Sequence, residues 1–397
     1  MSNLKTTRSV LVNPLTARCK DEEHRSATPL ELFYDLVYVV AIAFLAGELH
    51  HAITEMHHVP HALLMYLWIF WCVWWPWNTY TFFASGYDTD DTQFRLASFA
   101  QMIGVIIVAI GIKPAFQEEN FLYIMLGYLV MRVPYIVMWL KVARDDIESR
   151  PVALRYAFGV LLVQCGWTST VLFYQSWAAW IFLLICELLV PWFAERSTAK
   201  GQNTKYHVEH IEERMSLLTI IVLGESILAS VNAFDSALKA FTPELGIIVS
   251  GALLILFSMW WLYFDDHVEE ELHNETTCFI WSYGHYFLLA SAAAVGALIS
   301  VCVDAATQHG HIRMDEAVLG LSIALAVYLV ATWLCHDFIL KKKGFKLYEL
   351  LILAVTVVVL AITTKSVLLI GLAFMTLNTI RLWRKHREFK LLESTYS

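Results

Sequence analysis

Charged residues are scarce in this chain. Lys, Arg, Asp and Glu make up 16% of its 397 residues, whereas soluble domains average about 25%. The hydrophobic content of 58% is typical of a chain solvated by lipid rather than folded around one water-exposed globule. The scarcity of charge therefore excludes an ordinary soluble protein.

Basic surface, paired cysteines and catalytic motifs are lacking as well. The formal net charge of −8 argues against a nucleic-acid partner, because phosphates attract a basic face. None of the seven cysteines forms a Cys-x-x-Cys pair, so we expect no disulfide framework or zinc site. The chain has no P-loop, Gly-x-Ser-x-Gly elbow or His-Glu-x-x-His sequence. We expect neither an enzyme nor a cofactor.

What is present is a series of apolar runs, each long enough to cross a bilayer. The polar residues 1–29 contain no signal-peptide core, so the first run is itself the expected insertion signal. The runs predict an all-α bundle of about twelve transmembrane helices, at residues 30–55, 61–85, 93–113, 121–143, 152–173, 176–194, 212–234, 244–265, 277–303, 317–340, 346–364 and 366–383.

The distribution of Lys and Arg sets the expected orientation. With twelve spans and both termini in the cytoplasm, 23 basic residues lie on the cytoplasmic side and 4 outside. Such a bias follows the positive-inside rule only if the spans are counted correctly. We therefore expect a multi-pass protein of a bacterial inner membrane with cytoplasmic N-terminal (1–29), linker (195–210) and C-terminal (384–397) segments.

The two sets of six helices, 30–194 and 211–383, resemble each other. Leu67–Trp75 and Leu253–Trp261 are similar Trp-rich segments, 186 residues apart. A six-helix repeat is even, so its halves would be parallel, as in many transporters and channels. The alternative is chance similarity between helices of like composition.

Carboxylates occur deep in two of the expected helices. Glu31 fits a capping box with Thr28, and Asp35 lies one turn deeper on the same helix face. In the seventh run, Glu213 and Arg214 precede Glu225 by about three turns. Charges at such depth are costly and usually face a partner or a pathway. A neutral, hydrogen-bonded Glu225 is the structural alternative.

Further ionisable residues lie within apolar runs: Arg132, Glu187, His285, His336 and Asp337. Arg132 needs a carboxylate partner, and Asp35, Glu187 and Glu225 are all candidates. The pair is equally compatible with a structural role and with a place on an ion or substrate pathway.

Two groups of polar residues lie outside the expected spans. The cytoplasmic loop with Asp88, Asp90 and Asp91, and a second acidic loop at 265–271, suggest a cation-attracting vestibule or simple helix caps. External histidines lie near Glu48 and Glu55, and their spacing defines no metal site. These histidines are His50, His51, His57, His58 and His61.

Three segments resemble the bacterial low temperature requirement A (LtrA) family. They are Ala27–Val39, Asp88–Asp91, and Glu213-Arg214 followed by Thr219–Ser226. The family name reflects growth in the cold and implies no mechanism. The resemblance implies that these site residues lie in the family's signature segments: Glu31, Asp35, Asp88, Asp91, Glu213, Arg214 and Glu225.

Three functions stay open. The preferred hypothesis is a proton- or cation-coupled secondary transporter of a small solute or ion, with Glu225 and Asp35 as working carboxylates and Arg132 as their counter-charge. A cation channel is the second hypothesis, because Phe33-Tyr34-Asp35 is similar to the first-helix motif of TMEM-type potassium channels, although Tyr34 replaces their serine. The third is a non-conducting sensor or assembly protein. Homo-oligomers are possible under each hypothesis.

Overall fold

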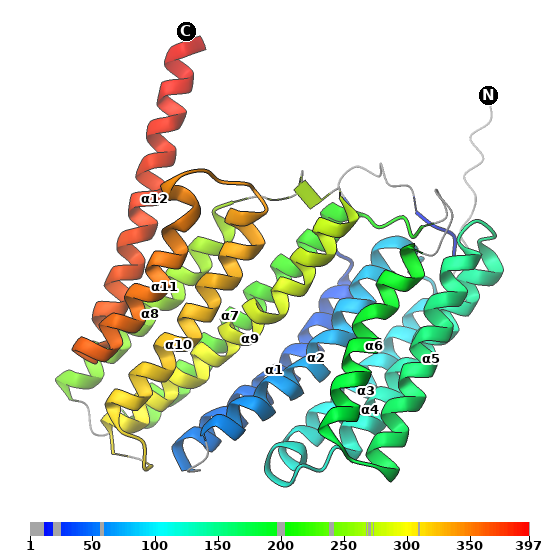
Figure 1. Ribbon diagram of the computed structural model, residues 1–397, viewed down its shortest axis with the longest axis horizontal. Coiled ribbons are helices and arrows are strands. Elements are labelled where there is room, and N and C mark those ends of the chain that lie inside the picture. The colour runs from blue at the N-terminus through cyan, green and yellow to red at the C-terminus, as the bar shows by residue number, and fades with distance from the viewer. Residues whose placement is uncertain are drawn as a thin grey trace. The chain divides into compact units, whose positions relative to one another are not determined.

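The computed structural model is all-helical, with no strand among the residues that it describes (Figure 1). These are 12–18, 25–55, 59–196, 203–237, 242–266, 268, 271–272, 274–308 and 310–396. Twelve helices in these ranges are long and apolar enough to cross a membrane, which confirms the predicted fold class and number of spans. Their bounds are α1 Pro29–Glu55, α2 Val59–Tyr87, α3 Thr92–Glu118, α4 Leu122–Asp145, α5 Arg150–Phe173, α6 Trp177–Arg196, α7 Val208–Ala237, α8 Pro243–Phe264, α9 Glu275–Ala306, α10 Met314–Thr332, α11 Phe345–Thr364 and α12 Val367–Tyr396.

Local sequence sets the ends of several helices. The backbone N–H of Thr28 donates to Glu31 Oε2 at 2.8 Å, and the backbone N–H of Glu31 donates to Thr28 Oγ1 at 3.3 Å, which is the predicted capping box. Lys365, in the left-handed conformation with φ of 53°, separates α11 from α12. A π-helical turn, η3 (Trp333–Phe338), continues α10.

The chain forms two compact units. Unit 1 contains residues 1–45 and 68–214, and unit 2 contains residues 46–67 and 215–397. Helices α1, α2 and α7 therefore contribute residues to both units. The boundaries fall inside these helices rather than at the predicted linker 195–210, and the sequence repeat itself stays a prediction.

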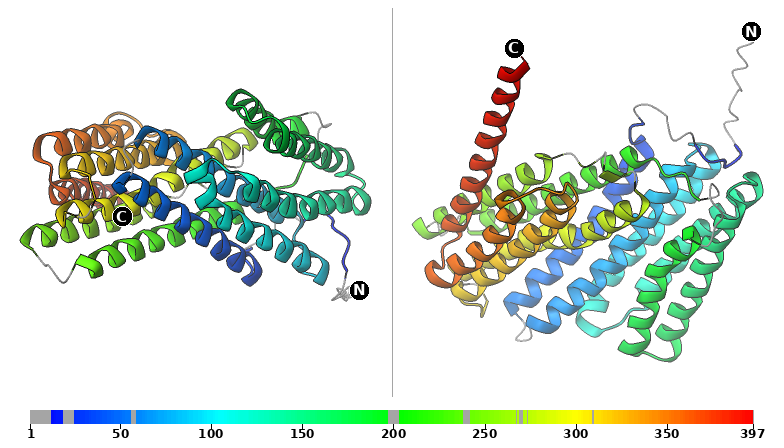
Figure 2. Two further views of the ribbon diagram at one scale, coloured as in Figure 1. Left: turned by 90° about the horizontal axis from the view of Figure 1, so that it is seen from below. Right: turned by 45° about the horizontal axis from the view of Figure 1, so that its top comes forward.

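Within each unit, helices that follow each other in sequence pack together. In unit 1, α3 packs on α4, α4 on α5 and α5 on α6; α5 and α6, in green, lie side by side in both views of Figure 2. In unit 2, the series runs from α8 through α9, α10 and α11 to α12, and α12 also packs on α8. Glycine residues allow some pairs of helices to approach each other closely. A Cβ on Gly127 would lie 2.6 Å from Gly104 O, and one on Gly371 would lie 2.7 Å from Gly251 O.

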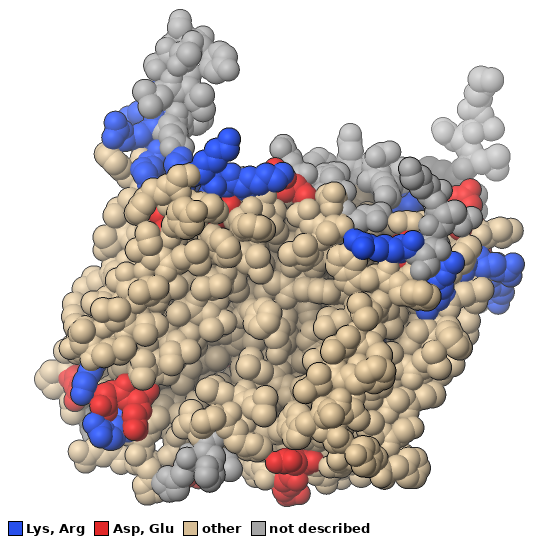
Figure 3. Space-filling view, viewed as in Figure 1, with Lys and Arg blue, Asp and Glu red and all other residues tan. Residues whose placement is uncertain are grey.

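The surface of the described helices is apolar. On the face in Figure 3, charged side chains lie at helix ends, and the long middle stretches show none. Large hydrophobic side chains within the helices are exposed, among them Val133, Phe182 and Val355. The protein is thus a multi-pass membrane protein in contact with the lipid bilayer.

Candidate functional site

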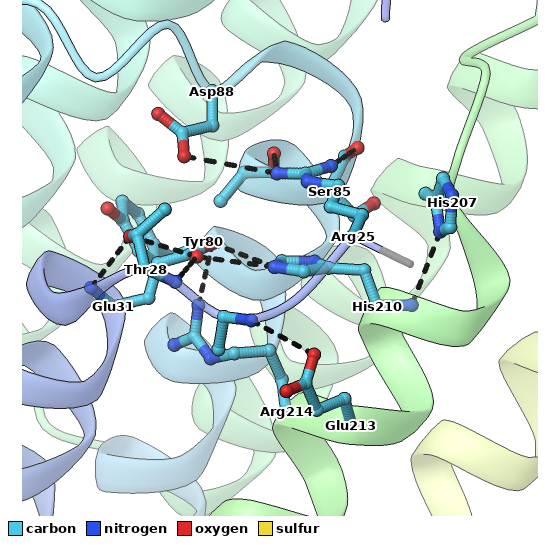
Figure 4. Close-up of polar contacts among 12 residues, drawn as sticks. Arg25, Thr28, Glu31, Tyr80, Ser85, Asp88, His207, His210, Glu213 and Arg214 are labelled. Atoms are coloured by element: carbon cyan, nitrogen blue, oxygen red, sulfur yellow. Dashed lines mark hydrogen bonds and ion pairs between the residues drawn. The ribbon is translucent and has the colours of Figure 1, made fainter. Parts of the chain in front are cut away.

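A buried ionic cluster lies inside unit 1, between α1 and the first turns of α7. Arg214 Nη2 and Nε donate to the Asp35 carboxylate at 2.5 and 3.2 Å. Arg214 Nη1 lies 3.1 Å from Glu31 Oε1, and His210 Nε2 lies 3.2 Å from the same carboxylate. All four side chains are fully shielded from solvent. We call Glu31, Asp35, His210 and Arg214 the charge cluster. Figure 4 labels Glu31, His210 and Arg214.

Helical periodicity explains how the charge cluster forms. Glu31 and Asp35 are four residues apart on α1, and His210 and Arg214 are four residues apart on α7. Residues at this spacing lie one above the other on the same helix face. Two acidic side chains on α1 therefore meet one basic side chain and one histidine on α7, and each carboxylate has a partner at its own level.

A second set of polar groups lies between the charge cluster and the chain segment before α3. Arg25 donates to the carbonyl oxygens of Ser85 and Ala84, and its Nη2 lies 3.9 Å from Asp88 Oδ2. Burial, reinforced by the negative charge of Glu31, raises the pKa of Asp88 to about 6. Asp88 is therefore a carboxyl group that titrates near neutral pH beside the charge cluster.

On the membrane side of the charge cluster, aromatic residues continue the polar contacts. Trp77 Nε1 donates to Asp35 Oδ1 at 2.6 Å. The hydroxyl groups of Tyr34 and Tyr38 are 3.1 Å apart, and Tyr38 donates to Met131 Sδ at 3.5 Å. Tyr80, which stacks on Tyr34, bonds to a serine hydroxyl on α3. These side chains carry a chain of polar groups toward α4.

An ion pair on α4 and α6 extends this series. Arg132 Nη2 donates to Glu187 Oε1 at 2.5 Å, and both residues are buried. Glu187 Oε2 accepts a hydrogen bond from Trp167 Nε1 at 2.9 Å. The guanidinium group also lies over the rings of Tyr128 and Tyr135, at 5.4 and 5.7 Å. Glu187 is thus the partner of Arg132, rather than Asp35 or Glu225.

A small cavity opens beside Glu187. Its volume is about 40 Å³. Its walls come from α2, α4, α5 and α6 and are almost entirely apolar, with Glu187 and Gln164 among the few polar members. The aromatic members are Trp68, Trp71, Phe121, Tyr128, Trp167 and Trp180. We call this space the aromatic cavity.

Comparison with known proteins confirms the family resemblance predicted from the sequence. The bacterial low temperature requirement A protein (LtrA) family model matches residues 26–381. This chain belongs to the LtrA family. An uncharacterized protein of Rhizobium meliloti (strain 1021) is 26% identical over 284 residues, which cover 68% of this chain and 67% of the relative. No solved structure matches.

In this LtrA-family protein, Glu225 lies apart from the charge cluster. It is on the part of α7 that belongs to unit 2, it is half-buried, and it has no polar partner among the described residues. A Cβ on Gly224 would meet no atom within 4 Å, so no other described helix packs closely against α7 at this glycine. The expected pairing of Arg132 with Asp35 and Glu225 is wrong. Arg214 is the counter-charge of Asp35.

The other predicted site residues have structural contacts. Glu213 Oε2 accepts from the backbone N–H of Ala27 at 2.9 Å. In unit 2, His285 contacts the Tyr263 hydroxyl through Nε2 at 2.9 Å and the Trp281 carbonyl through Nδ1 at 2.8 Å. Both ring nitrogens of His285 are thus engaged, which is typical of a neutral histidine in a packed core.

The acidic loop after α2 anchors helices. Asp91 caps α3 by accepting from the Phe94 N–H at 2.8 Å, and Asp90 forms two hydrogen bonds with Arg95. The Asn13 N–H also donates to Asp91. These contacts favour the helix-cap alternative over a cation-attracting vestibule. In the second acidic loop, residues 267, 269 and 270 lie outside the described residues.

The external histidines form no metal centre among the residues that the structure describes. His50 Nε2 lies 2.6 Å from Asp304 Oδ2, and His51 Nδ1 lies 3.4 Å from Glu55. His57 and His58 lie outside the described residues. The first pair joins the ends of α1 and α9, and the second lies within the last turn of α1.

Sequence reasoning missed two members of the site. His210 was not selected, although it precedes Arg214 by four residues and therefore shares its face. That spacing was the available signal. The donation of Trp77 to Asp35 had no comparable signal, because it joins residues 42 positions apart in a Trp-rich helix.

Proposed function

We propose that this LtrA-family protein is a proton-coupled secondary transporter whose proton-binding site is the charge cluster. The observation that carries the proposal is a count of buried charge. Glu31 and Asp35 contribute two negative charges and Arg214 contributes one positive charge, so the cluster carries −1 while His210 is neutral. Uptake of one proton makes the cluster neutral, and an uncompensated charge buried in a membrane protein is costly.

The geometry of His210 supports this role. Its Nε2 faces Glu31, whereas its Nδ1 is buried and has no hydrogen-bonding partner among the described residues. Histidine is the side chain whose ordinary pKa lies nearest physiological pH. A ring with one nitrogen beside a carboxylate and the other unengaged is suited to accept and release a proton.

Asp88 gives the proton a way into the charge cluster. Burial raises its pKa to about 6, and it lies at the end that the Lys/Arg distribution predicts to be cytoplasmic. On the other side of the cluster, the Tyr34–Tyr38 pair reaches Met131 on α4. A thioether carries no exchangeable proton, so the proposed proton route runs from Asp88 to the charge cluster and stops there.

The test is proton flux into proteoliposomes loaded with a pH-sensitive dye. Proton, potassium and sodium gradients are imposed separately, with and without small organic solutes, and the membrane potential is clamped. We expect wild-type flux that saturates. The variant His210→Gln should lower this flux by about tenfold or more, as expected for loss of a proton-transfer group. The matched control is His285→Gln, a buried histidine outside the charge cluster, which should retain wild-type flux.

Each other outcome selects a different function. Large currents that do not saturate and need no coupled gradient indicate a channel. The absence of proton flux under every gradient and with every solute contradicts the transporter proposal and favours the sensor hypothesis. An established transporter that is active in parallel vesicles serves as the control. Equal loss in His210→Gln and His285→Gln contradicts the assignment of the proton site.

A further inference from the structure

The aromatic cavity has the construction of a cation-binding cage. Trp68 stacks on Trp180 with ring centres 5.8 Å apart, and it meets Trp167 edge-on at 6.0 Å. Phe121 packs edge-on against Trp180 at 4.8 Å. The faces of aromatic rings carry the negative part of a quadrupole and therefore attract cations. Among tryptophan, tyrosine and phenylalanine, tryptophan attracts them most strongly. The one carboxylate in the cavity wall, Glu187, supplies a formal negative charge.

The protein already binds one cation in this manner. The Arg132 guanidinium group is held by the Glu187 carboxylate on one side and by the faces of Tyr128 and Tyr135 on others. Glu187 and Tyr128 are also members of the cavity wall. The same carboxylate and one of the same rings are therefore presented both to Arg132 and to the cavity.

The volume of the cavity and its apolar wall restrict which cations it can hold. A volume of about 40 Å³ holds roughly three water-sized groups, which suits a cation of a few heavy atoms. Metal ions such as Na⁺ or Mg²⁺ need several oxygen ligands, and the wall offers oxygens mainly from Glu187 and Gln164. An alkylammonium group needs none, because its methyl groups pack on the rings.

The charge count of unit 1 links this cavity to the proton site. The charge cluster and the Arg132–Glu187 pair together contain three carboxylates and two guanidinium groups, a net charge of −1. A protonated His210 or one bound monovalent cation brings the total to zero, but both together give +1. Proton binding and cation binding therefore oppose each other by linkage.

We infer that the aromatic cavity is a substrate site for a small alkylammonium cation, which is exchanged for one proton at the charge cluster. This inference rests on the proposed function and names its substrate class and direction of coupling. Glu187 and the Trp68 and Trp180 rings bind the cation, and His210 loses its proton as the cation enters.

The charge count covers only the buried groups. His210 faces Glu31 and Arg214 within the charge cluster, while His207, Glu213 and Arg25 lie around it. Glu213 is partly exposed, so water screens its negative charge and it is left out of the count. Arg25 and Asp88 are oppositely charged neighbours and leave the total unchanged when Asp88 is ionised. The experiment is therefore made at pH 7.5, above the pKa of Asp88, so that its proton does not enter the count.

The test is binding of radiolabelled dimethylammonium, which has three heavy atoms, to the full chain in lipid nanodiscs. We expect saturable binding that uncharged ethanol, of similar size, does not displace. Trp68→Leu should weaken binding by about tenfold or more, because it removes a cation–aromatic contact from a site that excludes water. The matched control Trp192→Leu alters an α6 tryptophan that lies against Arg196 and outside the cavity wall, and it should bind like wild type.

A charge-balanced pair of substitutions tests Glu187 without leaving Arg132 alone. Glu187→Gln combined with Arg132→Met removes both charges, so that the variant keeps no unpaired buried ion. It should fold and lose binding. Proton release on adding dimethylammonium chloride adjusted to the same pH, measured with a pH indicator in weak buffer, should be present in wild type and absent in His210→Gln.

The two proposals fail in different ways. Saturable proton flux with some other solute, but no dimethylammonium binding, overturns the cation inference and leaves the transporter proposal standing. Dimethylammonium binding without any flux contradicts the transporter proposal and retains the binding site. Equal displacement by ethanol, or wild-type binding in Trp68→Leu, overturns the assignment of a cation cage.

Discussion

Each compact unit contains a group of buried ions, and the two groups differ in balance. In unit 1, Arg214 faces two carboxylates, and all of these side chains are sealed from solvent. In unit 2, Asp265, Asp266 and Asp337 meet three cationic side chains: Lys342, Arg381 and Lys385. Lys342 and Lys385 are 18% and 41% exposed, so that group reaches the end of the helices.

The difference separates anchoring from function. The unit 2 group has equal numbers of charges and several alternative pairings, which joins α8, α10 with its π-helical turn, and α12. It needs no further ion. The charge cluster of unit 1 lacks one positive charge and has a histidine in place. The proposed proton site needs a missing positive charge that one proton can supply. A network with equal numbers of positive and negative charges has no such deficit.

The largest expected effect comes from removing the central arginine of each group. Arg214→Met leaves two carboxylates buried without their counter-charge, which should cost about 3–5 kcal/mol. Arg381→Met should cost only about 1 kcal/mol, because Asp337 and Asp266 retain Lys342 at 2.7 and 2.5 Å. Thermal unfolding of both variants in detergent measures the contrast. Equal losses would contradict the distinction between a deficient and a balanced group.

An intermediate effect is expected from pH, with opposite sign in the two units. Burial raises the pKa of Asp88 from 3.8 to about 6, so the stability that its neutral form provides is lost as pH rises through 6. Although burial disfavours the charge of Asp266, Lys342 and Lys385 hold its pKa well below the ordinary value. The stability that the Asp266 carboxylate provides is therefore present above pH 4 and lost below it.

Two asparagine variants separate these contributions. Relative to Asp88→Asn, wild type should lose up to about 3 kcal/mol between about pH 4 and 7. Relative to Asp266→Asn, the free energy of unfolding of wild type should not change between about pH 4 and 7, and it should fall only at lower pH. Melting temperatures measured from about pH 3 to 8 test both. If the difference in melting temperature between wild type and Asp88→Asn does not change with pH, Asp88 is not part of the proposed proton route.

Much of the fold could be predicted because it depends on composition along the chain. Runs of apolar residues and the Thr28–Glu31 capping box locate helices without reference to any distant residue. The break at Lys365 was the least evident boundary, since α11 and α12 are joined by only two residues.

The pairing of charges could be predicted only in part. Asp35 and Arg214 were identified because each is costly in a membrane, but they are 179 positions apart, and the cost does not say which partner compensates it. Arg132 had three possible partners in the sequence, and only the packing of α4 on α5 and α5 on α6 selects Glu187. Periodicity assigns a residue to a helix face, whereas tertiary packing decides what that face meets.

Glu225 gives the smallest expected effect and the sharpest test of this argument. It is eleven residues after Arg214 and so shares its face of α7, yet Arg214 is sealed among carboxylates while Glu225 is half-buried without a polar partner among the described residues. If the proton site lies within unit 1, Glu225→Gln should change proton flux by less than about twofold. Its free energy of unfolding should stay within about 0.5 kcal/mol of wild type, as for substitutions that remove no contact. Flux abolished in Glu225→Gln but retained in His210→Gln would move the working carboxylate from unit 1 to unit 2, and the charge deficit of unit 1 would then have only a structural meaning.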